Sequence, residues 1–400
     1  MRILHTSDWH LGRTFHGCDL GAEQEAVLSH LAGLVGEHAV DVVVVAGDVF
    51  DRALPNAETV RLYDRVLTSL RAAGARVVVS SGNHDSPARL GALAGFAAAG
   101  GLHLHTEVAA CAVPTVIAGA DGHDVAFYGL PYLEPDTARR ALGAPAGSGH
   151  AGVLGAALDA VRADLATRAV GTRSVVLAHA LVVPWQAPQE MAAESSVEVC
   201  DSERSLAVGG VQTAPSALFD GVDYVALGHL HGCQQPDVDR PWLRYSGSPL
   251  AYSFSEARQR KSVLLVDLGP DGLCAVQRIV LPVPRALATL TGRIEELLVD
   301  PAHARHASDW LQVVLTDDVR PQDPMRRLQT RFPHAVSVQW QPACAPVPDS
   351  LSPATRRPGR DDLATAADFV VWVRNSVPSD TERELLGRAL GAAQVREAVG

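Results

Sequence analysis

The chain has 400 residues, of which 47% are hydrophobic and 20% are charged, and its formal net charge is −11. This length is too great for one ordinary hydrophobic core and predicts two or three domains. The negative charge argues against nucleic-acid binding through bulk electrostatics, but it is compatible with a local basic groove or with bound metal ions.

Three further features of composition limit the class of protein. No apolar run approaches 18 residues and the N-terminal residues do not form a leader peptide, so we expect a cytoplasmic protein without a membrane span. The six cysteines lack CxxC spacing, which favours reduced thiols over a disulfide framework or a zinc ribbon. Lys261 is the only lysine among 34 basic residues, so an arginine by itself indicates little about phosphate recognition.

Strands alternate with helices over the first part of the chain. Apolar runs bounded by glycine predict buried strands, and leucines at helical spacing predict helices between them. The predicted strands are 2–7, 41–46, 77–79, 125–130, 174–177, 223–227, 242–246 and 262–268. The predicted helices are 22–37, 55–71, a segment that begins near Pro87, and 152–168. Residues 184–217 predict a long loop, and the whole succession implies an α/β fold with helices on both faces of a sheet.

The pattern restarts after Pro282 and Pro284 as a smaller α+β unit. We therefore predict a first domain over residues 1–281, a second over 282–341, a Pro- and Arg-containing linker over 342–360 and a helical tail over 361–400.

Polar side chains follow five of the predicted strands. Residues two apart in a strand share a face, so Asp8 with His10 and His229 with His231 can each point into one cavity. The complete set of predicted donors is Asp8, His10, Asp48, Asn83, His179, His229 and His231. Oxygen and imidazole donors suit first-row divalent metals, and seven donors fit two ions that share a carboxylate, an arrangement that can cleave phosphate esters. A single histidine at a strand end is usually structural, but this many together favour a metal centre.

Five blocks of sequence form a specific pattern: MRILHTSDWHLG (1–12), AGDVFD (46–51), GNHDS (82–86), DYVALGHLH (223–231) and YSGSPL (245–250). They resemble the calcineurin-like metallophosphoesterases and, within them, the SbcD nuclease family. The resemblance covers about residues 1–280, and the segment after Pro282 matches a family capping domain in position only. It implies a β-sandwich flanked by helices, a smaller α+β capping domain that binds DNA, and a short helical tail.

The same resemblance implies roles for individual residues. Asp8, His10 and His231 would hold one ion, Asn83, His179 and His229 would hold the other, and Asp48 would bridge them. The ions would be Mn²⁺ first, with Mg²⁺ or Fe²⁺ as alternatives.

The resemblance also places His84, which is not a ligand, beside the scissile phosphate as a catalytic residue. Asp85 has two readings, because it can orient the His84 ring or lock the turn that carries it. Arg52 and Arg89 are candidates for contact with DNA phosphate, whereas His5 and His105 are expected to be structural or surface residues, as are His16 and His103.

We rank three functions for this sequence. The first is a metal-dependent DNA nuclease subunit, a double-strand exonuclease and single-strand or hairpin endonuclease, that acts with an SbcC-type SMC-like ATPase in DNA repair and recombination. The second is a non-catalytic scaffold that binds DNA ends, and the third is a phosphoesterase for small molecules or phosphoproteins. The first hypothesis also predicts a homodimer, binding of DNA ends and hairpins, and a cytoplasmic, nucleoid-associated location.

The tail shows the pattern of two short helices. Leu363, Ala366, Ala367, Val370 and Val373 recur at helical spacing, with Phe369 and Trp372 beside them. After Pro378, Ser379 and Glu382 have the spacing of a capping box, and the helix they would begin carries Leu385, Leu386 and Leu390. Such helices are marginal alone in water, so we expect this helix-loop-helix to dock on the ATPase partner or to pack on the chain's own second domain.

Overall fold

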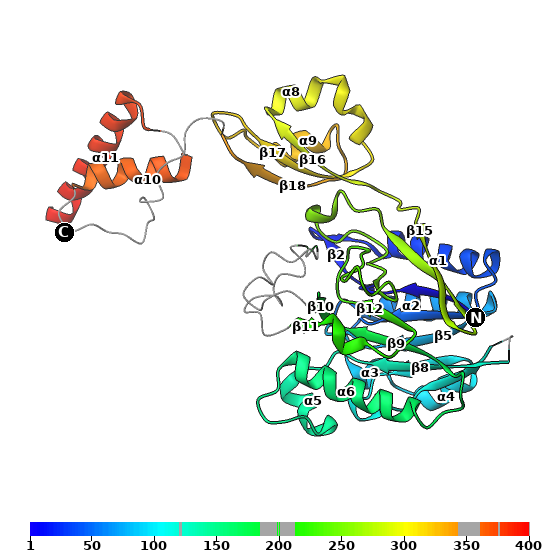
Figure 1. Cartoon of the computed structure of the whole chain (residues 1–400). Coiled ribbons are helices and arrows are strands. Elements are labelled where there is room, and N and C mark those ends of the chain that lie inside the picture. The colour runs from blue at the N-terminus through cyan, green and yellow to red at the C-terminus, as the bar shows by residue number, and fades with distance from the viewer. Residues whose placement is uncertain are drawn as a thin grey trace. The chain divides into compact units, whose positions relative to one another are not determined.

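The computed structural model describes residues 1–119, 122–184, 198, 200, 213–342, 361–374 and 377–399. Two compact units are present, Met1–Ala286 and Leu287–Gly400 (Figure 1). Most of the predicted loop 184–217 and nearly all of the predicted linker 342–360 lie outside the described residues. The division into four segments therefore stays a prediction.

A six-stranded sheet forms one layer of the first unit. Its strand order is β15-β14-β1-β4-β5-β6. The bounds are β1 (Arg2–Thr6), β4 (Val42–Ala46), β5 (Arg76–Ser80), β6 (Leu102–His105), β14 (Ser262–Gly269) and β15 (Gly272–Val280). Strands β1, β4, β5 and β6 are parallel, whereas β14 runs antiparallel to both β1 and β15.

A five-stranded sheet forms the second layer, in the order β13-β12-β9-β8-β7. Its strands are β7 (Thr115–Ala118), β8 (Asp124–Leu130), β9 (Arg173–His179), β12 (Tyr224–Gly228) and β13 (Leu243–Tyr245). Four of them are parallel, and β7 is an antiparallel edge strand.

The two sheets pack face to face around a shared core. Val42 and Val44 of β4 belong to the same buried cluster as Val175 and Leu177 of β9. The alternate residues of β4 are buried as well, which explains why this strand is a continuous run of valines. The predicted β-sandwich is therefore confirmed.

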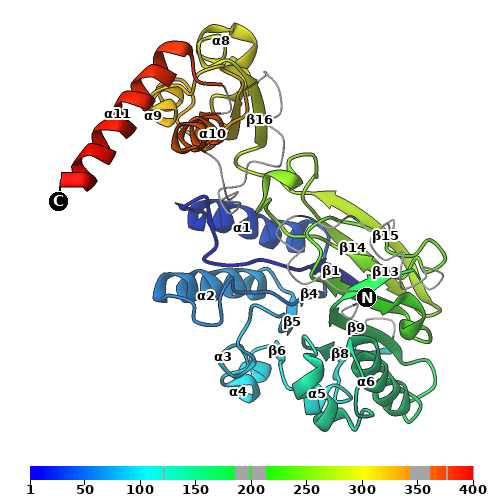
Figure 2. The ribbon, with the colours of Figure 1, turned by 90° about the vertical axis from the view of Figure 1, so that its left-hand side faces the viewer.

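Helices cover the outer faces of the two sheets (Figure 2). Helices α1 (Gly21–Glu37) and α2 (Ala57–Ala72) lie beside the six-stranded sheet and bury leucines at helical spacing. Helices α5 (Pro135–Leu142) and α6 (His150–Leu165) pack on the five-stranded sheet, and Leu154 and Leu158 of α6 share a core cluster with β8, β9 and β12. The Asn56 side chain caps α2 by accepting from the Thr59 amide at 2.9 Å.

Short elements complete the first unit. They are β2 (Thr14–Phe15), β3 (Cys18–Asp19), α3 (Pro87–Leu90), α4 (Ala94–Ala99), η1 (Val108–Ala110), β10 (Leu181–Val183), β11 (Thr213–Pro215), η3 (Ser216–Phe219) and η4 (Phe254–Glu256). Strands β6, β7 and β15 were not predicted, and β11 and the start of η3 lie within the predicted loop.

The second unit contains a three-stranded parallel sheet. The elements are β16 (Leu287–Gly292), α8 (Ile294–Val299), η5 (Pro301–His306), β17 (Trp310–Leu315), α9 (Pro324–Gln329) and β18 (Ala335–Trp340). The strand order β16-β17-β18 and the intervening helices make two successive βαβ connections around a core that includes Leu311 and Phe332.

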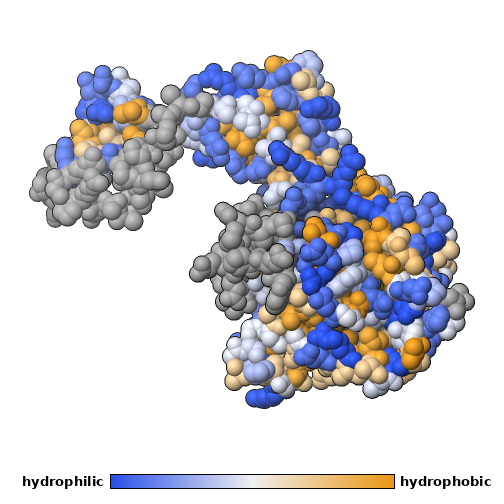
Figure 3. All heavy atoms as spheres, in the orientation of Figure 1, coloured by the Kyte–Doolittle hydropathy of each residue, from blue (hydrophilic) through white to orange (hydrophobic). Residues whose placement is uncertain are grey.

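Two helices form the tail, α10 (Asp362–Arg374) and α11 (Asp380–Val399). The capping box predicted for α11 is present, because the Ser379 amide donates to Glu382 Oε2 at 2.7 Å and the Glu382 amide donates to Ser379 Oγ at 3.4 Å. The two helices contact each other. Gly387 of α11 lies so close to Leu363 of α10 that an added Cβ atom would be 3.9 Å from Leu363 Cδ2. Phe369 is 58% exposed and Leu385 is 59% exposed, and hydrophobic residues are visible on the tail surface (Figure 3).

None of the helices that the structure describes has both the length and the apolar character required to cross a membrane.

Candidate metal centre

The predicted donors lie at the carboxyl ends of five strands drawn from both sheets. Strands β1, β4 and β5 of the six-stranded sheet lead to Asp8 and His10, to Asp48 and to Asn83. Strand β9 ends at His179, and His229 and His231 follow β12 of the five-stranded sheet. Because strands β1, β4, β5, β9 and β12 are parallel within their sheets, their ends bring residues from distant parts of the chain to one place.

Backbone hydrogen bonds hold the segment after β1 against the segment after β4. The Asp8 amide donates to Gly47 O at 3.1 Å, and the His10 amide donates to Asp48 O at 3.0 Å. On the other side, the buried amide of Gln24 from α1 donates to His10 O at 2.8 Å and to Trp9 O at 3.2 Å. The first pair of donors is therefore fixed by two elements at once.

Ligand atoms of the predicted donors converge in overlapping groups. Asp8, His10 and His231 form one group whose ligand atoms lie within 4.8 Å of one another, and all three residues are buried. Asp8 also groups in this way with Asp48 and His179. The Nε2 atoms of His10 and His231 lie 3.2 Å apart.

The remaining two donors join the same cluster. Asn83 Oδ1 lies 3.0 Å from His179 Nε2, and the rings of His179 and His229 are 5.3 Å apart between centroids. The His229 amide donates to Asp8 Oδ1 at 3.0 Å. The structure thus brings all seven predicted donors together.

His84 lies beside the cluster, and its ring is held by Asp51 and not by Asp85, the partner considered from the sequence. Its Nδ1 atom donates to the Asp51 carbonyl at 2.9 Å, and its backbone amide donates to Asp48 Oδ1 at 2.9 Å. The His84 ring packs edge-on against His10 at 4.8 Å between centroids. His84 and Asn83 are only half-buried, so the cluster is open to solvent on this side.

The contacts of Asp85 are those of a turn lock. Its carboxylate accepts from the backbone amides of Gly82 at 2.9 Å, Phe50 at 2.9 Å and Val49 at 3.1 Å. These three bonds tie the turn after β5 to the segment after β4. These are the contacts expected if Asp85 locks the turn. The His84 ring nitrogen that Asp85 could have oriented is instead bonded to the Asp51 carbonyl.

The backbone is strained where the donors lie. Eight non-glycine residues in the described part of the chain have positive φ, and four of them are Asp8 (53°), His10 (45°), Asp48 (49°) and His229 (104°). Residues with side chains adopt such conformations rarely, and they concentrate at functional sites. Close approach also requires glycine at Gly228, where a Cβ would lie 1.7 Å from Ala46 O.

Burial and neighbouring charges shift the pKa values of the donors in opposite directions. Burial raises the pKa of Asp8 to about 6. Burial has the same tendency at Asp48, but His179 and His10 outweigh it and bring the pKa of Asp48 well below its usual range. Burial opposes the charged form of His179, yet the Asp48 carboxylate prevails and raises its pKa to about 9.

Two of the other imidazoles, those of His10 and His229, are kept neutral. Burial lowers the pKa of His229 to about 3 and brings the pKa of His10 well below its usual value. A neutral buried imidazole keeps the lone pair that a metal ion binds, and Nδ1 of His10 has no hydrogen-bond partner within the described residues. Two carboxylates, an amide oxygen and four imidazoles converging in this way fit a divalent first-row cation.

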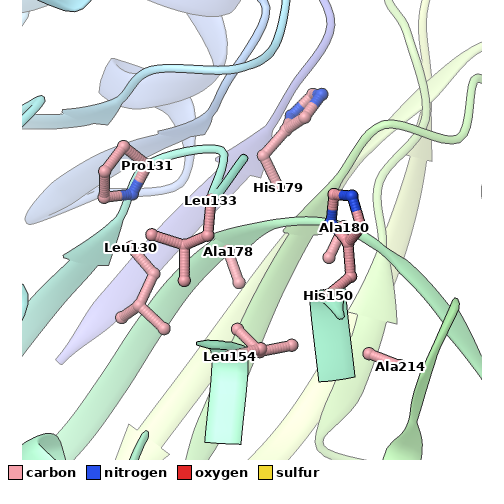
Figure 4. Close-up of a pocket in the computed structure, with 9 residues that line it drawn as sticks. All are labelled: Leu130, Pro131, Leu133, His150, Leu154, Ala178, His179, Ala180 and Ala214. Carbon is pink, nitrogen blue, oxygen red and sulfur yellow. The ribbon is translucent and has the colours of Figure 1, made fainter. Parts of the chain in front are cut away.

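A small pocket lies next to His179 (Figure 4). Leu130, Leu133 and Leu154 line it together with His150 of α6.

Sequence reasoning missed four residues that support the cluster: Gln24, Asp51, Glu256 and Lys261. Glu256 Oε1 accepts from His231 Nδ1 at 3.2 Å and Lys261 Nζ lies 2.6 Å from Glu256 Oε2, with both residues buried. Burial opposes ionisation of Glu256, but Lys261 and His231 lower its pKa to about 2. The one feature of the sequence that could have pointed to this pair is that Lys261 is the only lysine.

Three other residues named in the sequence analysis are His5, expected to be structural or at the surface, and the candidate phosphate contacts Arg52 and Arg89. His5 is fully buried between Tyr224 OH and Leu227 O, in agreement with a structural role. Arg52 is largely exposed, with its guanidinium 3.7 Å from Asp51. Arg89 is exposed and lies 3.5 Å from Ser86 Oγ.

The calcineurin-like phosphoesterase family matches residues 1–233, more than half of the chain. With the two-sheet fold and the cluster of donors, this match defines the chain as a metallophosphoesterase that binds divalent metal. Two similar proteins are the SbcD subunits of nuclease SbcCD from Escherichia coli K12 and from E. coli O157:H7, each 32% identical over 339 residues that cover 82% of this chain and 81% of the relative. The chain belongs to the SbcD nuclease family and is a metal-dependent nuclease subunit that hydrolyses phosphodiesters.

Two further likenesses complete the comparison. Residues 283–352 match the family described as type 5 capsule protein repressor C-terminal domain. A dimetal phosphatase from Danio rerio is 12% identical with a TM-score of 0.37, over 70% of this chain and 99% of that chain. The predicted family, fold class and nuclease function are confirmed, and the roles of individual site residues stay predictions.

Proposed function

We propose that the seven donors hold two divalent ions, with Mn²⁺ as the first candidate. Asp8, His10 and His231 would bind one ion, and Asn83, His179 and His229 would bind the other. Asp48 would bridge them, since its carboxylate lies 3.6 Å from His10 Nε2 and 3.4 Å from His179 Nε2. The observation that carries this proposal is the convergence of donors from five strand ends of two sheets.

The chemistry divides between the ions and the chain's own residues. Two bound divalent ions activate water near neutral pH and stabilise the charge that develops on a phosphate ester. Asp8 and Asp48 supply the negative charge that balances the cations in a buried site. The chain as a whole is acidic, so metal ions at this site would provide the positive charge that attracts a phosphate backbone.

His84 is proposed to act on the substrate. Because Nδ1 donates to the Asp51 carbonyl, the ring is fixed in one tautomer and orientation, and Nε2 is left for a group that enters from solvent. In its imidazolium form the ring can donate the Nε2 proton to the leaving oxygen and return to the neutral form that keeps the proton on Nδ1. Asp85 is proposed to position His84 indirectly, by locking the turn that carries it.

The substrate and partner follow from the family. We propose cleavage of DNA ends and hairpins by double-strand exonuclease and single-strand endonuclease activity, in a complex with an SbcC-type ATPase. The exposed apolar residues of α10 and α11 are the proposed docking surface, and residues 282–341 the proposed DNA-binding cap. Arg52, which is exposed beside the site, is a candidate phosphate contact. This role in DNA repair and recombination implies a cytoplasmic, nucleoid-associated location.

A homodimer is also proposed. Phe96 of α4 is 83% exposed and the adjacent Leu93 is 74% exposed, which is unusual for large apolar side chains on one short segment. Burial of this segment against a second copy would remove both from water. Sedimentation of Phe96→Glu against the unmodified chain tests this proposal, and an unchanged dimer would place the interface elsewhere.

The central experiment compares the chain with Asp48→Asn. Loss of a bridging carboxylate removes a ligand from each ion, so we expect reduced metal content at both positions and no cleavage. Metal is counted by elemental analysis, and cleavage is measured on end-labelled duplex and hairpin DNA with Mn²⁺ or Mg²⁺, with and without the ATPase partner. Two ions per chain in the variant would contradict the bridging role, and an unmodified chain that binds DNA ends without cutting them would favour a scaffold.

A further inference from the structure

Behind the proposed metal ligand His231 lies a buried ion pair, Glu256–Lys261. Glu256 is 0% exposed and Lys261 is 4% exposed. Glu256 is the last residue of η4, and Lys261 directly precedes β14, so the two charges come from a short connection that the fold turns inward. A buried ion pair seldom adds stability on its own account, because desolvation offsets the attraction. Its presence here therefore requires another explanation.

The environment of Lys261 is specific for a compact ammonium group. Its Nζ atom faces four acceptors, namely Glu256 Oε2 at 2.6 Å, Gln259 Oε1 at 2.9 Å, Ser248 Oγ at 3.0 Å and His231 O at 3.0 Å. A planar guanidinium spreads its donors over three nitrogens and cannot place one of them at this point without displacing the others. The neighbouring residues Arg258 and Arg260 are arginines, as is every other basic residue apart from histidine, so the lysine stands where arginine does not fit.

The ion pair holds His231 at two points. Lys261 binds the backbone carbonyl of His231 directly, and Glu256 Oε1 accepts from its ring Nδ1 at 3.2 Å. Glu256 is itself fixed by the Tyr252 amide, which donates to the same oxygen at 3.2 Å. With Nδ1 donating, the lone pair of the His231 ring lies on Nε2, the atom that faces His10 Nε2 at 3.2 Å.

This carboxylate partner differs from the partners of the His179 and His84 rings. Nδ1 of His179 donates to the neutral carbonyl of Ala46, and Nδ1 of His84 donates to that of Asp51. A carboxylate partner makes a histidine ligand more basic than a carbonyl partner does. The proposed ligands His231 and His179 therefore differ in the charge of their second hydrogen-bond partner.

We propose that Glu256 and Lys261 are positioning residues that orient His231 and strengthen its bond to one of the two metal ions; this inference rests on the ligand assignment of the proposed function. Lys261 holds the Glu256 carboxylate in place at 2.6 Å, and Glu256 fixes the tautomer and direction of the ring. Loss of either should weaken the ion held with Asp8 and His10 and spare the ion held with His179.

The test measures binding of Mn²⁺ to the metal-free full-length chain by calorimetry and elemental analysis. Glu256→Gln keeps the shape of the side chain, and Glu256→Gln combined with Lys261→Met removes both buried charges without leaving one unpaired. We expect both variants to lose about 10–100-fold in affinity for one ion and to keep the other. Lys261→Arg should behave in the same way. Arg2→Met is the matched control, because it removes the exposed 2.8 Å pair with Asp267 on β1 and β14 and should change neither affinity.

The outcomes separate this inference from the proposed function. An unmodified chain that binds fewer than two ions contradicts the proposed ligand assignment. Two ions in the unmodified chain, together with unchanged affinities in the variants, overturn the positioning role. Equal weakening of both ions indicates a structural role only and also overturns it, and full affinity in Lys261→Arg refutes the requirement for an ammonium group.

Discussion

His84 differs from the four histidines among the proposed ligands because its ring is only half-buried and borders solvent, whereas theirs are buried. We expect His84→Gln to keep both ions and DNA affinity while the turnover number falls about 10²–10⁴-fold, the usual contribution of general acid–base assistance. Metal content, DNA binding and single-turnover cleavage measure the three quantities. His30→Gln, on the exposed face of α1, is the control. Loss of metal from His84→Gln would instead place this ring among the ligands.

His5 makes the stability of the fold depend on pH. Its burial lowers the pKa to about 3, whereas an unfolded chain has a histidine pKa near 6.5. Below pH 6.5 the unfolded state therefore binds a proton that the folded state excludes, so the folded state loses stability as the pH falls. This residue alone should reduce the free energy of unfolding by about 2 kcal/mol between pH 7.5 and pH 5.

Comparison with His5→Gln isolates that contribution. We expect the variant to be less stable at pH 7.5, because the bonds to Tyr224 and Leu227 are altered, but to lose less stability on acidification. Urea unfolding at several pH values measures the difference. Parallel pH profiles would show that His5 takes up a proton in the folded state.

At the level of residues, the donors could be predicted because each lies at the end of a strand, or within a few residues after it, and the apolar run of that strand is visible in the sequence. The supporting residues could not. Glu256 and Lys261 lie in a hydrophilic segment, SEARQRK, whose composition is typical of an exposed loop, and only the folded chain shows that two of its charges are buried. The partner of His84 is a backbone carbonyl, which any residue at position 51 would supply.

At the level of elements, the valine-rich strands β4 and β5 were predicted because both of their faces are buried. Strand β15 was missed because most of its side chains are half-buried or exposed, and its sequence has no strong apolar period. Strand β6 alternates leucine with histidine, and its pairing with β5 rather than its composition defines it. Edge strands depend on the neighbour they pair with, which a local pattern does not contain.

The ends of β4 and β12 approach so closely that a methyl group would separate them. A Cβ at Gly228 would lie 1.7 Å from Ala46 O. This oxygen belongs to the backbone of β4, so it cannot move aside by a change of rotamer as a side chain can. We expect Gly228→Ala to shift the end of β12 and to reduce metal content and thermal stability together. Gly33→Ala is the control, since it lies within α1 with no atom near the added methyl and should stabilise the chain by about 0.5–1 kcal/mol. Full metal content in Gly228→Ala would show that the two strand ends can separate without cost to the site.

At the level of the whole molecule, catalysis and partner binding are expected to be separable. The proposed metal centre lies entirely in the first unit, whereas the exposed apolar residues of α10 and α11 belong to the second. We expect deletion of residues 361–400 to leave metal content and Mn²⁺-dependent cleavage nearly intact. Co-purification with the SbcC-type partner and ATP-dependent cleavage should be lost.

A double substitution refines that experiment. Phe369→Glu with Leu385→Glu places charges on the two exposed apolar positions without shortening the chain. It should reproduce the loss of co-purification if these helices dock on the partner. A deleted chain that still elutes with the ATPase would locate the docking surface elsewhere, and a deleted chain that no longer folds would favour packing of the tail on its own second domain.

The hydrogen bond from the His229 amide to the Asp8 carboxylate joins residues 221 positions apart. A ribosome releases Asp8 long before it releases His231, so the nascent chain holds isolated donors and no complete site until the five-stranded sheet is nearly finished. Closing such long loops is slow, and metal ions cannot guide the early steps of folding because their ligands have not yet met. Metal loading is consequently a late step of maturation, and the cellular supply of metal should determine the fraction of active chains without changing how fast the chain folds.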